Sequence, residues 1–516
     1  MRYVIGVDIG TSSTKAVLFD TNGQQIRRSG KGYMLRSPEP GAAEQDPNDI
    51  VQAVQQTVKT VVKDSGIDPN TLIGISFSAA MHTLLLIDEA NQPLTPMYTW
   101  ADNRSHPLLS ELTSKANKKK PTLYQRTSVP VHPMSPVVKL AWIKQTQPAI
   151  FSQTARVVSI KEYVLYHWCG EWVVDASIAS TTGLFNLSEG DWDIHALEIA
   201  GVRTEQLSKV VPTTHQLQLK ESAAKEMGIT ASTPVIVGAS DGVLSNIGVG
   251  AITSRQAAIT LGTSGAIRQV VEQPTTAEKA QLFCYVLDES RWVMGGAVNN
   301  GGIALQWTRD SLVPYSVPPE EQMLSTSEPS RSTYERLTKM AAEVSPGAEG
   351  LIFHPHILGE RAPLWNAQAR GNFFGLGRHH TQSHLVRAVM EGVLYNLAAV
   401  FEALEAAGGE ITTLRASGGF AYSGLWQQML ADIFEREVII PTVIESSALG
   451  AAVLALVAIG EWSNLAQVQD CVGLNQSRQP ITEHVKRYRK ILPIYQDLLA
   501  GFNKQYAALQ TALNSH

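Results

Sequence analysis

Two short segments, one in each half of the chain, combine glycine with hydroxyl-bearing side chains as phosphate-binding turns do. The first spans residues 8–15 and the second residues 260–265, and each has a Gly-Thr-Ser turn between two apolar runs. Backbone N–H groups beside small side chains can approach phosphate oxygens closely. A lone segment of this kind also fits a structural hairpin, but the second copy favours two related domains that hold one polyphosphate.

The first segment offers side chains for both phosphate and metal. Gly10, Thr11 and Ser12 leave the main chain accessible, Lys15 adds positive charge, and Asp8 ends an apolar strand. A carboxylate at that place suits hydrated Mg²⁺, which prefers one or two carboxylates together with phosphate oxygens. Neither the P-loop motif nor the GxGxxG motif occurs in the sequence, so those two kinds of nucleotide site are not expected.

Asp241 follows the apolar strand expected over residues 234–238, and we expect it to act as the general base. Residues at the carboxyl end of a strand usually face the region where α/β sheets bind ligands. The small residues before Asp241 and Gly242 after it leave room for a bulky acceptor. The alternative is an aspartate that only caps a turn.

Aromatic and polar side chains gather after two further strands, which is typical of a site for a polyol. Met81 and His82 follow one strand, and Trp100, Asp102 and Arg104 follow another. An aromatic ring covers the C–H face of a sugar while polar groups bind its hydroxyls. We expect these five residues to bind the acceptor together with the base.

The second half of the chain supplies the expected nucleotide site. Gly262 and Thr263 form its phosphate turn, and the pair Gly418-Gly419 lies between a predicted strand and a predicted helix. Exposed glycine backbone suits a flat adenine ring. Asn299 begins a polar loop that either reaches the nucleotide or caps the next helix.

The order of elements predicts an α/β fold with an antiparallel meander at its start. Asp46 and Pro47 open a helix that extends to about residue 64, and residues 72–78 form the next buried strand. Long helices are expected over 383–407 and 448–459. We divide the chain into residues 1–248, with the first hairpin and the sugar site, and residues 249–516, with the second hairpin and the adenosine site.

Composition limits the classes of function. The net charge of −5 argues against nucleic-acid binding, and 44% hydrophobic with 17% charged residues is typical of a globular protein. Three separated cysteines fit a reducing compartment. The longest uncharged apolar run, residues 448–460, is shorter than the ~20 residues of a membrane span, and no signal peptide is evident. We expect a cytoplasmic protein without a membrane partner.

Three longer segments resemble the FGGY family of carbohydrate kinases, and the resemblance covers essentially the whole chain. They are residues 371–391, which look like the C-terminal signature of the family, and residues 359–365 and 445–452. The resemblance implies two actin-like (ribonuclease H-like) ATPase domains around a central cleft. It also implies ATP and Mg²⁺ as cofactors and phosphoryl transfer to a sugar or polyol hydroxyl.

The resemblance also implies residue roles at matching positions. It places Asp8 at the metal and phosphate, Asp241 as the base, and Gly419 and Ser423 at the adenosine. Gly10, Thr11, Gly262 and Thr263 fall at phosphate positions. Ser423 departs from the Asn of some relatives, so a side-chain contact with adenine is not implied there.

Within the family, segments 78–82, 99–105, 132–136 and 238–246 look like the gluconokinase subfamily. This likeness implies D-gluconate as the acceptor and 6-phospho-D-gluconate as the product. A carboxylate on the substrate requires a basic partner or convergent N–H groups. Arg104, Arg126 and Lys161 are the candidates, and the sequence does not choose among them.

Two alternatives stay open at this point. One is another kinase of the family that acts on xylulose or a related pentulose or polyol. The other is an actin-like ATPase or sugar sensor without kinase activity. The chain begins at the nucleotide strand with no preceding DNA-binding helices, which disfavours a sensor. Family habit suggests a homodimer.

Overall fold

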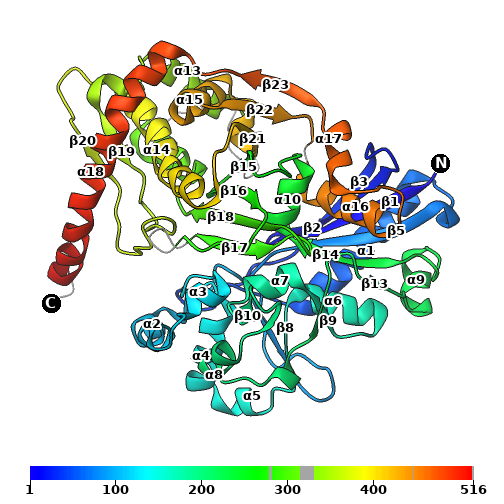
Figure 1. Cartoon of the computed structure of the whole chain (residues 1–516). Helices are drawn as coiled ribbons and strands as arrows, with labels where there is room; N and C mark the ends of the chain where they lie inside the picture. The colour runs from blue at the N-terminus through cyan, green and yellow to red at the C-terminus, as the bar shows by residue number, and fades with distance from the viewer. Residues whose placement is uncertain (278–281, 314–330, 444, 514–516) are drawn as a thin grey trace, which may run out of the picture. The chain divides into compact units, whose positions relative to one another are not determined.

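The structure is a computed structural model that describes residues 1–277, 282–313, 331–443 and 445–513 (Figure 1). The chain packs into two compact units that interleave along the sequence. The first unit comprises Met1–Thr253, Val270–Met294 and Val443–Gly473. The second comprises Ser254–Gln269, Gly295–Thr442 and Leu474–His516. The domain division that we expect between residues 248 and 249 stays a prediction. The first unit, as defined by contacts, extends to Thr253 and also includes two later segments of the chain.

The first unit is built on a mixed sheet with strand order β13-β14-β5-β1-β2-β3. Its strands are β1 (Tyr3–Ile9), β2 (Ser13–Asp20), β3 (Gln25–Gly32), β4 (Glu44–Gln45), β5 (Leu72–Ala79), β6 (Leu85–Ile87), β7 (Met97–Tyr98), β8 (Arg156–Val158), β9 (Val173–Asp175), β10 (Phe185–Asn186), β11 (Asp191–Trp192), β12 (Lys209–Val211), β13 (Gln216–Leu217), β14 (Val235–Ser240) and β17 (Phe283–Val286). Strands β1, β2 and β3 form the predicted antiparallel meander, and β5 and β14 continue the sheet in parallel with β1.

The first unit also contains many helices, some of which pack on this sheet. They are α1 (Pro47–Ser65), α2 (Leu109–Lys118), α3 (Leu123–Thr127), α4 (Pro136–Thr146), α5 (Pro148–Ser152), α6 (Ile160–Cys169), α7 (Ala176–Thr181), α8 (Ile194–Ala200), α9 (Glu221–Met227), α10 (Asp241–Gly248), α16 (Ser446–Ala458) and α17 (Val468–Cys471). Asp46 caps α1 through the N–H of Asn48, as its sequence predicts. Helix α16 packs so closely on β1 that a Cβ at Gly6 would lie 1.9 Å from the carbonyl oxygen of Ala448.

The second sheet has seven strands in the order β17-β18-β16-β15-β21-β22-β23, and its last six strands repeat the pattern of the first sheet. The strands of the second unit are β15 (Gln256–Leu261), β16 (Gly265–Val271), β18 (Trp292–Val298), β19 (Ile352–His354), β20 (Asn372–Phe374), β21 (Thr413–Ser417), β22 (Glu437–Pro441) and β23 (Leu474–Arg478). Strands β15 and β16 form the second predicted hairpin, and β21 pairs in parallel with β15. The predicted α/β fold with two related halves is confirmed.

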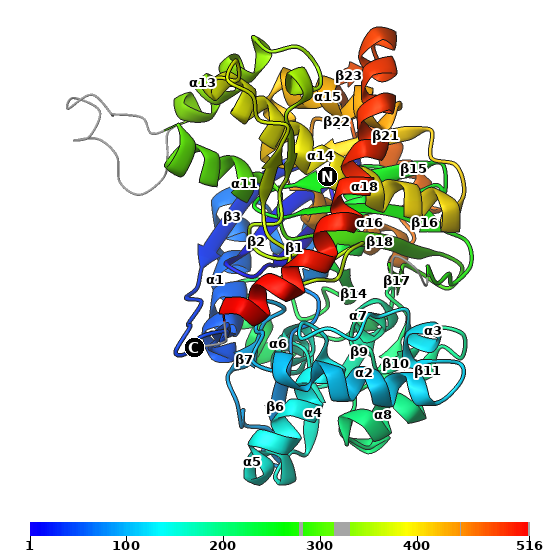
Figure 2. The same ribbon diagram turned by 90° about the vertical axis from the view of Figure 1, so that its left-hand side faces the viewer.

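The helices of the second unit are α11 (Gly302–Trp307), α13 (Arg331–Ala342), α14 (Gln382–Gly408), α15 (Gly424–Phe434) and α18 (Thr482–Leu513). Among the described residues, α14 is the one helix long and apolar enough to cross a membrane, but 83% of its most apolar window is buried. It is a core helix, and α18 lies alongside it (Figure 2). Its residue Glu391 binds Arg387 and Tyr488, which joins the two helices.

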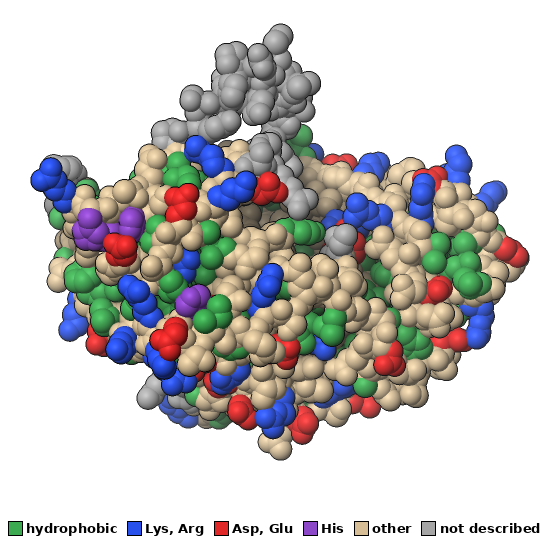
Figure 3. Space-filling view, turned by 90° about the horizontal axis from the view of Figure 1, so that it is seen from above, with side chains coloured by type: hydrophobic (Ala, Val, Ile, Leu, Met, Phe, Trp, Pro, Cys, Tyr) green, Lys and Arg blue, Asp and Glu red, His purple; other side chains and the backbone are tan. Residues whose placement is uncertain are grey.

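Charged side chains of both signs are interspersed over the face of the molecule shown in Figure 3. No large basic area is visible on that face. This distribution agrees with the small negative net charge of the sequence.

Candidate active site

The carboxyl ends of three parallel strands bring the predicted metal-binding carboxylate and the predicted catalytic carboxylate to one edge of the first sheet. Asp8 on β1 and Ala239 on β14 both align with Ser78 on β5, and Asp241 follows two residues after Ala239. Ser78 Oγ donates a hydrogen bond to Asp8 Oδ1 at 2.7 Å. Asp241 is the first residue of α10, where the helix dipole favours an ionised carboxylate.

Asp8 lies in an environment that disfavours its charge. Burial raises the pKa of Asp8 to about 6, and the charges of Asp241 and Glu445 add to this effect. The hydrogen bond from Ser78 and the charge of Lys15 act in the opposite direction. Burial is therefore the main reason why Asp8 holds a proton more readily than an ordinary aspartate.

The first phosphate turn is braced by side chains from three other segments. The hydroxyl of Tyr33 donates to the carbonyl of Gly10, and Gln45 Nε2 donates to the carbonyl of Thr11 at 2.7 Å. Trp100 Nε1 donates to Thr11 Oγ1 at 3.0 Å. The structure thus brings a predicted acceptor residue and a predicted phosphate residue together.

Sequence reasoning missed Tyr33 and Gln45. Burial, with a contribution from the charge of Asp8, raises the pKa of Tyr33, so this hydroxyl stays neutral. Tyr33 follows β3 and Gln45 lies in the short strand β4, in segments that carry no motif, and only the folded chain brings them to the turn. The remaining predicted turn residue, Ser12, is exposed at the tip.

The positive charge of Lys15 is already shared with a carboxylate. Lys15 Nζ lies 2.8 Å from Glu445 Oε2, while Arg28 reaches the other oxygen of Glu445 at 3.2 Å. The side chain of Lys15 is 43% exposed, so it remains accessible to a phosphate that competes with Glu445.

His82 is held in a fixed orientation beside the acceptor cluster. It is buried, with a left-handed backbone (φ 61°), and its Nδ1 lies 2.7 Å from the carbonyl oxygen of Thr181. A carbonyl only accepts, so Nδ1 carries the proton in the neutral ring, and Nε2 accepts from the hydroxyl of Tyr285 at 3.3 Å. The neighbouring residue Met81 is half-buried.

Asp102 and Arg104 form an internal ion-pair network. Arg104 Nη2 lies 2.7 Å from Asp102 Oδ2, and Arg104 also binds Glu39 and Glu44. Asp102 is buried and accepts from the N–H of Ala43 at 3.0 Å. These two side chains attach the loop around Glu39–Glu44 to the acceptor loop.

All three basic residues considered for a substrate carboxylate already have a carboxylate of the chain as partner. Arg126 Nε lies 3.0 Å from Asp193, and Lys161 Nζ lies 2.5 Å from Asp175. A substrate carboxylate would have to compete with these partners or with the three around Arg104.

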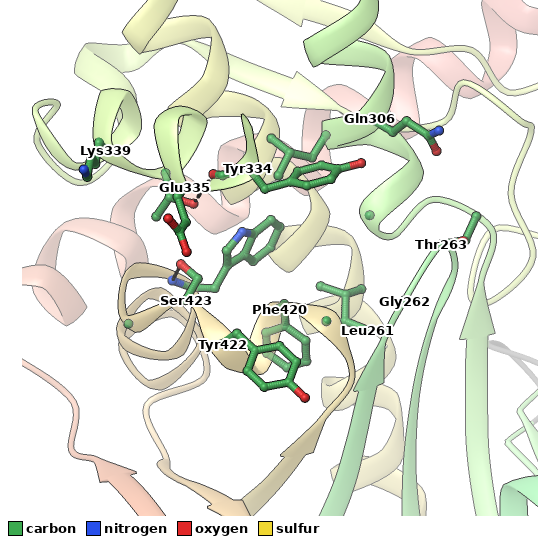
Figure 4. A pocket seen from close by; sticks show the side chains of 16 residues that line it. Leu261, Gly262, Thr263, Gln306, Tyr334, Glu335, Lys339, Phe420, Tyr422 and Ser423 are labelled. Atoms are coloured by element: carbon green, nitrogen blue, oxygen red, sulfur yellow. Dashed lines mark hydrogen bonds between the residues drawn. The ribbon is translucent and has the colours of Figure 1, made fainter. Parts of the chain in front are cut away.

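The second unit contains a cavity of about 810 Å³ (Figure 4). It is lined by Leu261, Gly262, Thr263, Gly302, Leu305, Gln306, Tyr334, Glu335, Thr338, Lys339, Gly419, Phe420, Tyr422, Ser423, Gly424 and Trp426. Gly262 and Thr263 lie at one end, and Glu335 and Ser423 lie together at the other (Figure 4). An apolar floor between a phosphate turn and a polar end suits a nucleotide.

The phosphate turn of this cavity is held by the start of α11. The N–H groups of Gly301 and Ile303 both donate to the carbonyl of Thr263 at 3.1 Å, and the N–H of Gly302 donates to the carbonyl of Gly262 at 2.6 Å. The turn carries no charged side chain. Its binding groups are therefore neutral backbone and hydroxyl groups.

Gly418 and Gly419, the predicted glycine pair, differ in the structural reason for having no side chain. Gly418 has φ 105°, and a Cβ there would lie 2.4 Å from the carbonyl oxygen of Leu261. A Cβ at Gly419 would meet nothing within 4 Å, so its exposed backbone faces open space in the cavity. Ser423 caps α15 by accepting from the N–H of Trp426 at 3.4 Å.

Asn299 does not line this cavity. Its side chain donates to the carbonyl of Leu358 at 3.2 Å, and its N–H donates to the buried carboxylate of Glu360 at 2.5 Å. Sequence reasoning missed Glu360, whose buried carboxylate accepts hydrogen bonds from several residues around this loop. It also missed Tyr334 and Glu335 of α13, which line the cavity. The α13 segment carries no motif that indicates a nucleotide.

Comparisons with known proteins agree with this geometry. Residues 3–248 match the N-terminal domain of the FGGY family of carbohydrate kinases, and residues 257–459 match its C-terminal domain. A gluconokinase from Bacillus subtilis is 45% identical over 510 residues, which is 98% of this chain and 97% of that protein.

Two solved structures from Lactobacillus acidophilus are similar over nearly the whole chain. A gluconate kinase has a TM-score of 0.91 at 34% identity, covering 98% of this chain and 99% of its own. A ligand-bound xylulose kinase also has a TM-score of 0.91 at 34% identity, covering 99% of this chain and 100% of its own. The protein is therefore an actin-like, two-domain member of the FGGY family of carbohydrate kinases.

Proposed function

We propose that the protein transfers the γ-phosphoryl group of ATP to the terminal hydroxyl of D-gluconate. The products are 6-phospho-D-gluconate and ADP. The observation that carries this proposal is the 45% identity to a gluconokinase along 98% of the chain. The solved gluconate kinase and xylulose kinase are equally similar to this chain, each at 34% identity and a TM-score of 0.91, so these two structures do not choose between the acceptors.

Asp241 is the general base in this proposal. It accepts the proton of the terminal hydroxyl while that oxygen forms a bond to the γ-phosphorus and the bond from phosphorus to the β–γ bridging oxygen breaks. ADP leaves with the electron pair of that bond. A positioned base contributes roughly 10²–10⁴-fold to such a reaction. Met81, His82 and Trp100 hold the acceptor, and Asp102 and Arg104 support the acceptor loop.

Asp8 is the proposed holder of hydrated Mg²⁺. The donor set fits a hard cation, since the oxygen ligand is a buried carboxylate on which the charges of Asp241 and Glu445 also act, and Mg²⁺ prefers carboxylate oxygens. When bound, Mg²⁺ would neutralise charge on the phosphates. Gly10, Thr11, Ser12 and Lys15 bind phosphate oxygens beside it.

The nucleotide occupies the cavity of the second unit in this proposal. Gly262 and Thr263 bind phosphate, and Gly419 supports the base. Asn299 acts indirectly, since its side chain holds the loop at Leu358. Ser423 and Gly418 shape the cavity wall. The enzyme is proposed to work in the cytoplasm, where ATP is available, and as a homodimer.

The deciding experiment is ADP release with Mg-ATP and D-gluconate, beside D-xylulose, glycerol and no acceptor. Strong release with gluconate alone is expected. ADP release with xylulose instead would support kinase function but show that the acceptor is xylulose rather than gluconate. Release that does not depend on an acceptor would contradict kinase function and favour an ATPase.

A further inference from the structure

Helix α7 connects the proposed base with the proposed acceptor-binding histidine. At its start, Ser177 Oγ accepts from the N–H of Ser240 at 3.2 Å and lies 3.1 Å from the hydroxyl of Ser240. Ser240 directly precedes Asp241. At its end, the carbonyl of Thr181 accepts from His82 Nδ1 at 2.7 Å. One short helix therefore contacts the segments of both functional residues.

A deeply buried ion pair anchors this helix. Asp175 caps α7 by accepting from the N–H of Ile178 at 2.8 Å, and its other oxygen lies 2.5 Å from Lys161 Nζ. The side chains of Lys161 and Asp175 are 1% and 0% exposed. Burial of two charges contributes little net stability, because the desolvation cost offsets their attraction. A positional role explains this pair better than stability does.

Lys161, the positively charged member of this ion pair, also lies next to the segment of the proposed acceptor residue His82. Lys161 is the second residue of α6, and the N–H of Ile160 before it donates to Thr83 Oγ1 at 3.1 Å. Thr83 directly follows His82. Burial lowers the pKa of Lys161, while the charges of Asp175 and nearby Asp241 act to raise it. Lys161 thus lies within electrostatic range of the proposed base.

We propose that the Lys161–Asp175 ion pair, acting through α7, positions Asp241 and His82 relative to one another for phosphoryl transfer. Lys161 is then a positioning residue rather than a partner of the substrate carboxylate. The inference rests on the proposed function, since it takes Asp241 as the base and His82 as an acceptor contact.

The test uses the double variant Lys161→Met/Asp175→Asn in the full-length chain. Loss of Lys161 alone would leave an uncompensated buried carboxylate and endanger folding. The double variant removes both charges, keeps a side-chain oxygen to cap α7 and conserves volume. The measured quantities are the melting temperature, the affinity for ADP, and kcat and KM for gluconate from pH 5 to 9.

We expect the double variant to fold and to bind ADP as the wild type does, with kcat reduced at least tenfold and KM changed less than threefold. The acid limb of the kcat profile should also move, because Lys161, whose charge acts on Asp241, and its partner Asp175 are both neutralised and the segment before Asp241 loses its anchor. Unchanged kcat and an unchanged limb would overturn the inference. A raised KM with unchanged kcat would also overturn it, since that result indicates direct binding of the substrate by Lys161.

Two controls separate the possible failures. The variant Arg387→Met/Glu391→Gln removes another buried ion pair, at 2.6 Å, in the second unit and should leave kcat and the acid limb as in the wild type. Asp241→Asn is measured in parallel. If Asp241→Asn retains full turnover, the proposed base is wrong, whereas loss of turnover only in Asp241→Asn rejects the positioning role alone.

Discussion

The two halves of the molecule use one strand pattern to present different chemistry. In the first unit, β1 and β5 align Asp8 with Ser78, whose hydroxyl donates to the carboxylate at 2.7 Å. In the second unit, β15 and β21 align Thr260 with Ser417, whose hydroxyl oxygens lie 3.2 Å apart. The same strand position therefore carries a carboxylate in one half and a neutral hydroxyl in the other.

This difference extends to the turns that follow. The first turn has Lys15 beside it and Asp241 at the same sheet edge, whereas the second turn carries no charged side chain and accepts backbone hydrogen bonds from the start of α11. Metal and proton chemistry require charge, but a nucleotide can be held by neutral N–H groups. In the proposed function, the charged first turn serves metal and proton chemistry and the neutral second turn holds the nucleotide.

The largest effect is expected at the proposed base. Asp241→Asn should lower turnover with gluconate by about 10²–10⁴-fold, because Asn cannot accept the hydroxyl proton. The KM for gluconate should change only a few-fold. Initial-rate ADP release measures both constants. The control Asp191→Asn, at an exposed position of the same unit, should match the wild type. Turnover of Asp241→Asn within a few-fold of wild type would remove Asp241 from this role.

The next largest effect is expected for Asp8→Asn, in the pH dependence of the free energy of unfolding. Its pKa is about 6 in the folded chain against an ordinary value of 3.8 for aspartate, so the folded state favours the protonated form. The stabilisation from that proton is complete below about pH 4 and is lost as pH rises through about 6. Asp8→Asn imitates the protonated carboxyl, so without metal it should be more stable than wild type at pH 8 by roughly 2–3 kcal/mol.

Urea unfolding at pH 4 and pH 8 measures this difference. The advantage of Asp8→Asn should disappear toward pH 4, and its kinase activity should be low at both values. Thr260→Val, the corresponding change in the second unit, should show no such pH dependence. An advantage of Asp8→Asn that is the same at both pH values would contradict the electrostatic origin.

Much of the fold could be predicted from local patterns. Both hairpins, the strand before Asp241 and helix α14 follow from apolar runs, turn residues and caps that lie within a few positions of each other. Asp241 and Gly419 could be selected because a small-residue environment surrounds them in the sequence.

The rest depends on long-range packing. Arg104 looks accessible in its segment, but Glu39 and Glu44, some sixty positions earlier, surround it in the folded chain. Tyr33 reaches the first phosphate turn, and Glu335 reaches the nucleotide cavity, through tertiary contacts that no spacing indicates.

A matched pair of glycine variants tests the nucleotide cavity of the second unit, whose phosphate turn is neutral. Gly419→Val should fold normally and weaken ADP binding about tenfold, because its side chain enters open space in the cavity. Gly418→Val should instead destabilise the unit, since its Cβ would clash with the carbonyl of Leu261. Thermal melting and ADP titration separate the two outcomes. Equal effects of both variants on melting would contradict the assignment.

The smallest effect is expected at Lys15. Lys15→Met should raise the KM for ATP only a few-fold, because the half-exposed charge of Lys15 is screened by solvent and already shared with Glu445. Glu445→Gln should have the opposite sign and lower the KM for ATP, since it releases Lys15 toward phosphate. Initial rates at varied ATP concentration test both. If Lys15→Met instead slows turnover at saturating ATP by roughly 10²-fold, the role of Lys15 is catalytic.

The division of roles is tested most directly by amide hydrogen exchange with each ligand alone. Gluconate should slow exchange in residues 80–105 and in α7 of the first unit. ADP should slow exchange in α13 and residues 418–424 of the second unit. Each ligand should leave the other set unchanged, which is the result that the account predicts. Protection of α13 by gluconate alone, or of residues 80–105 by ADP alone, would contradict it.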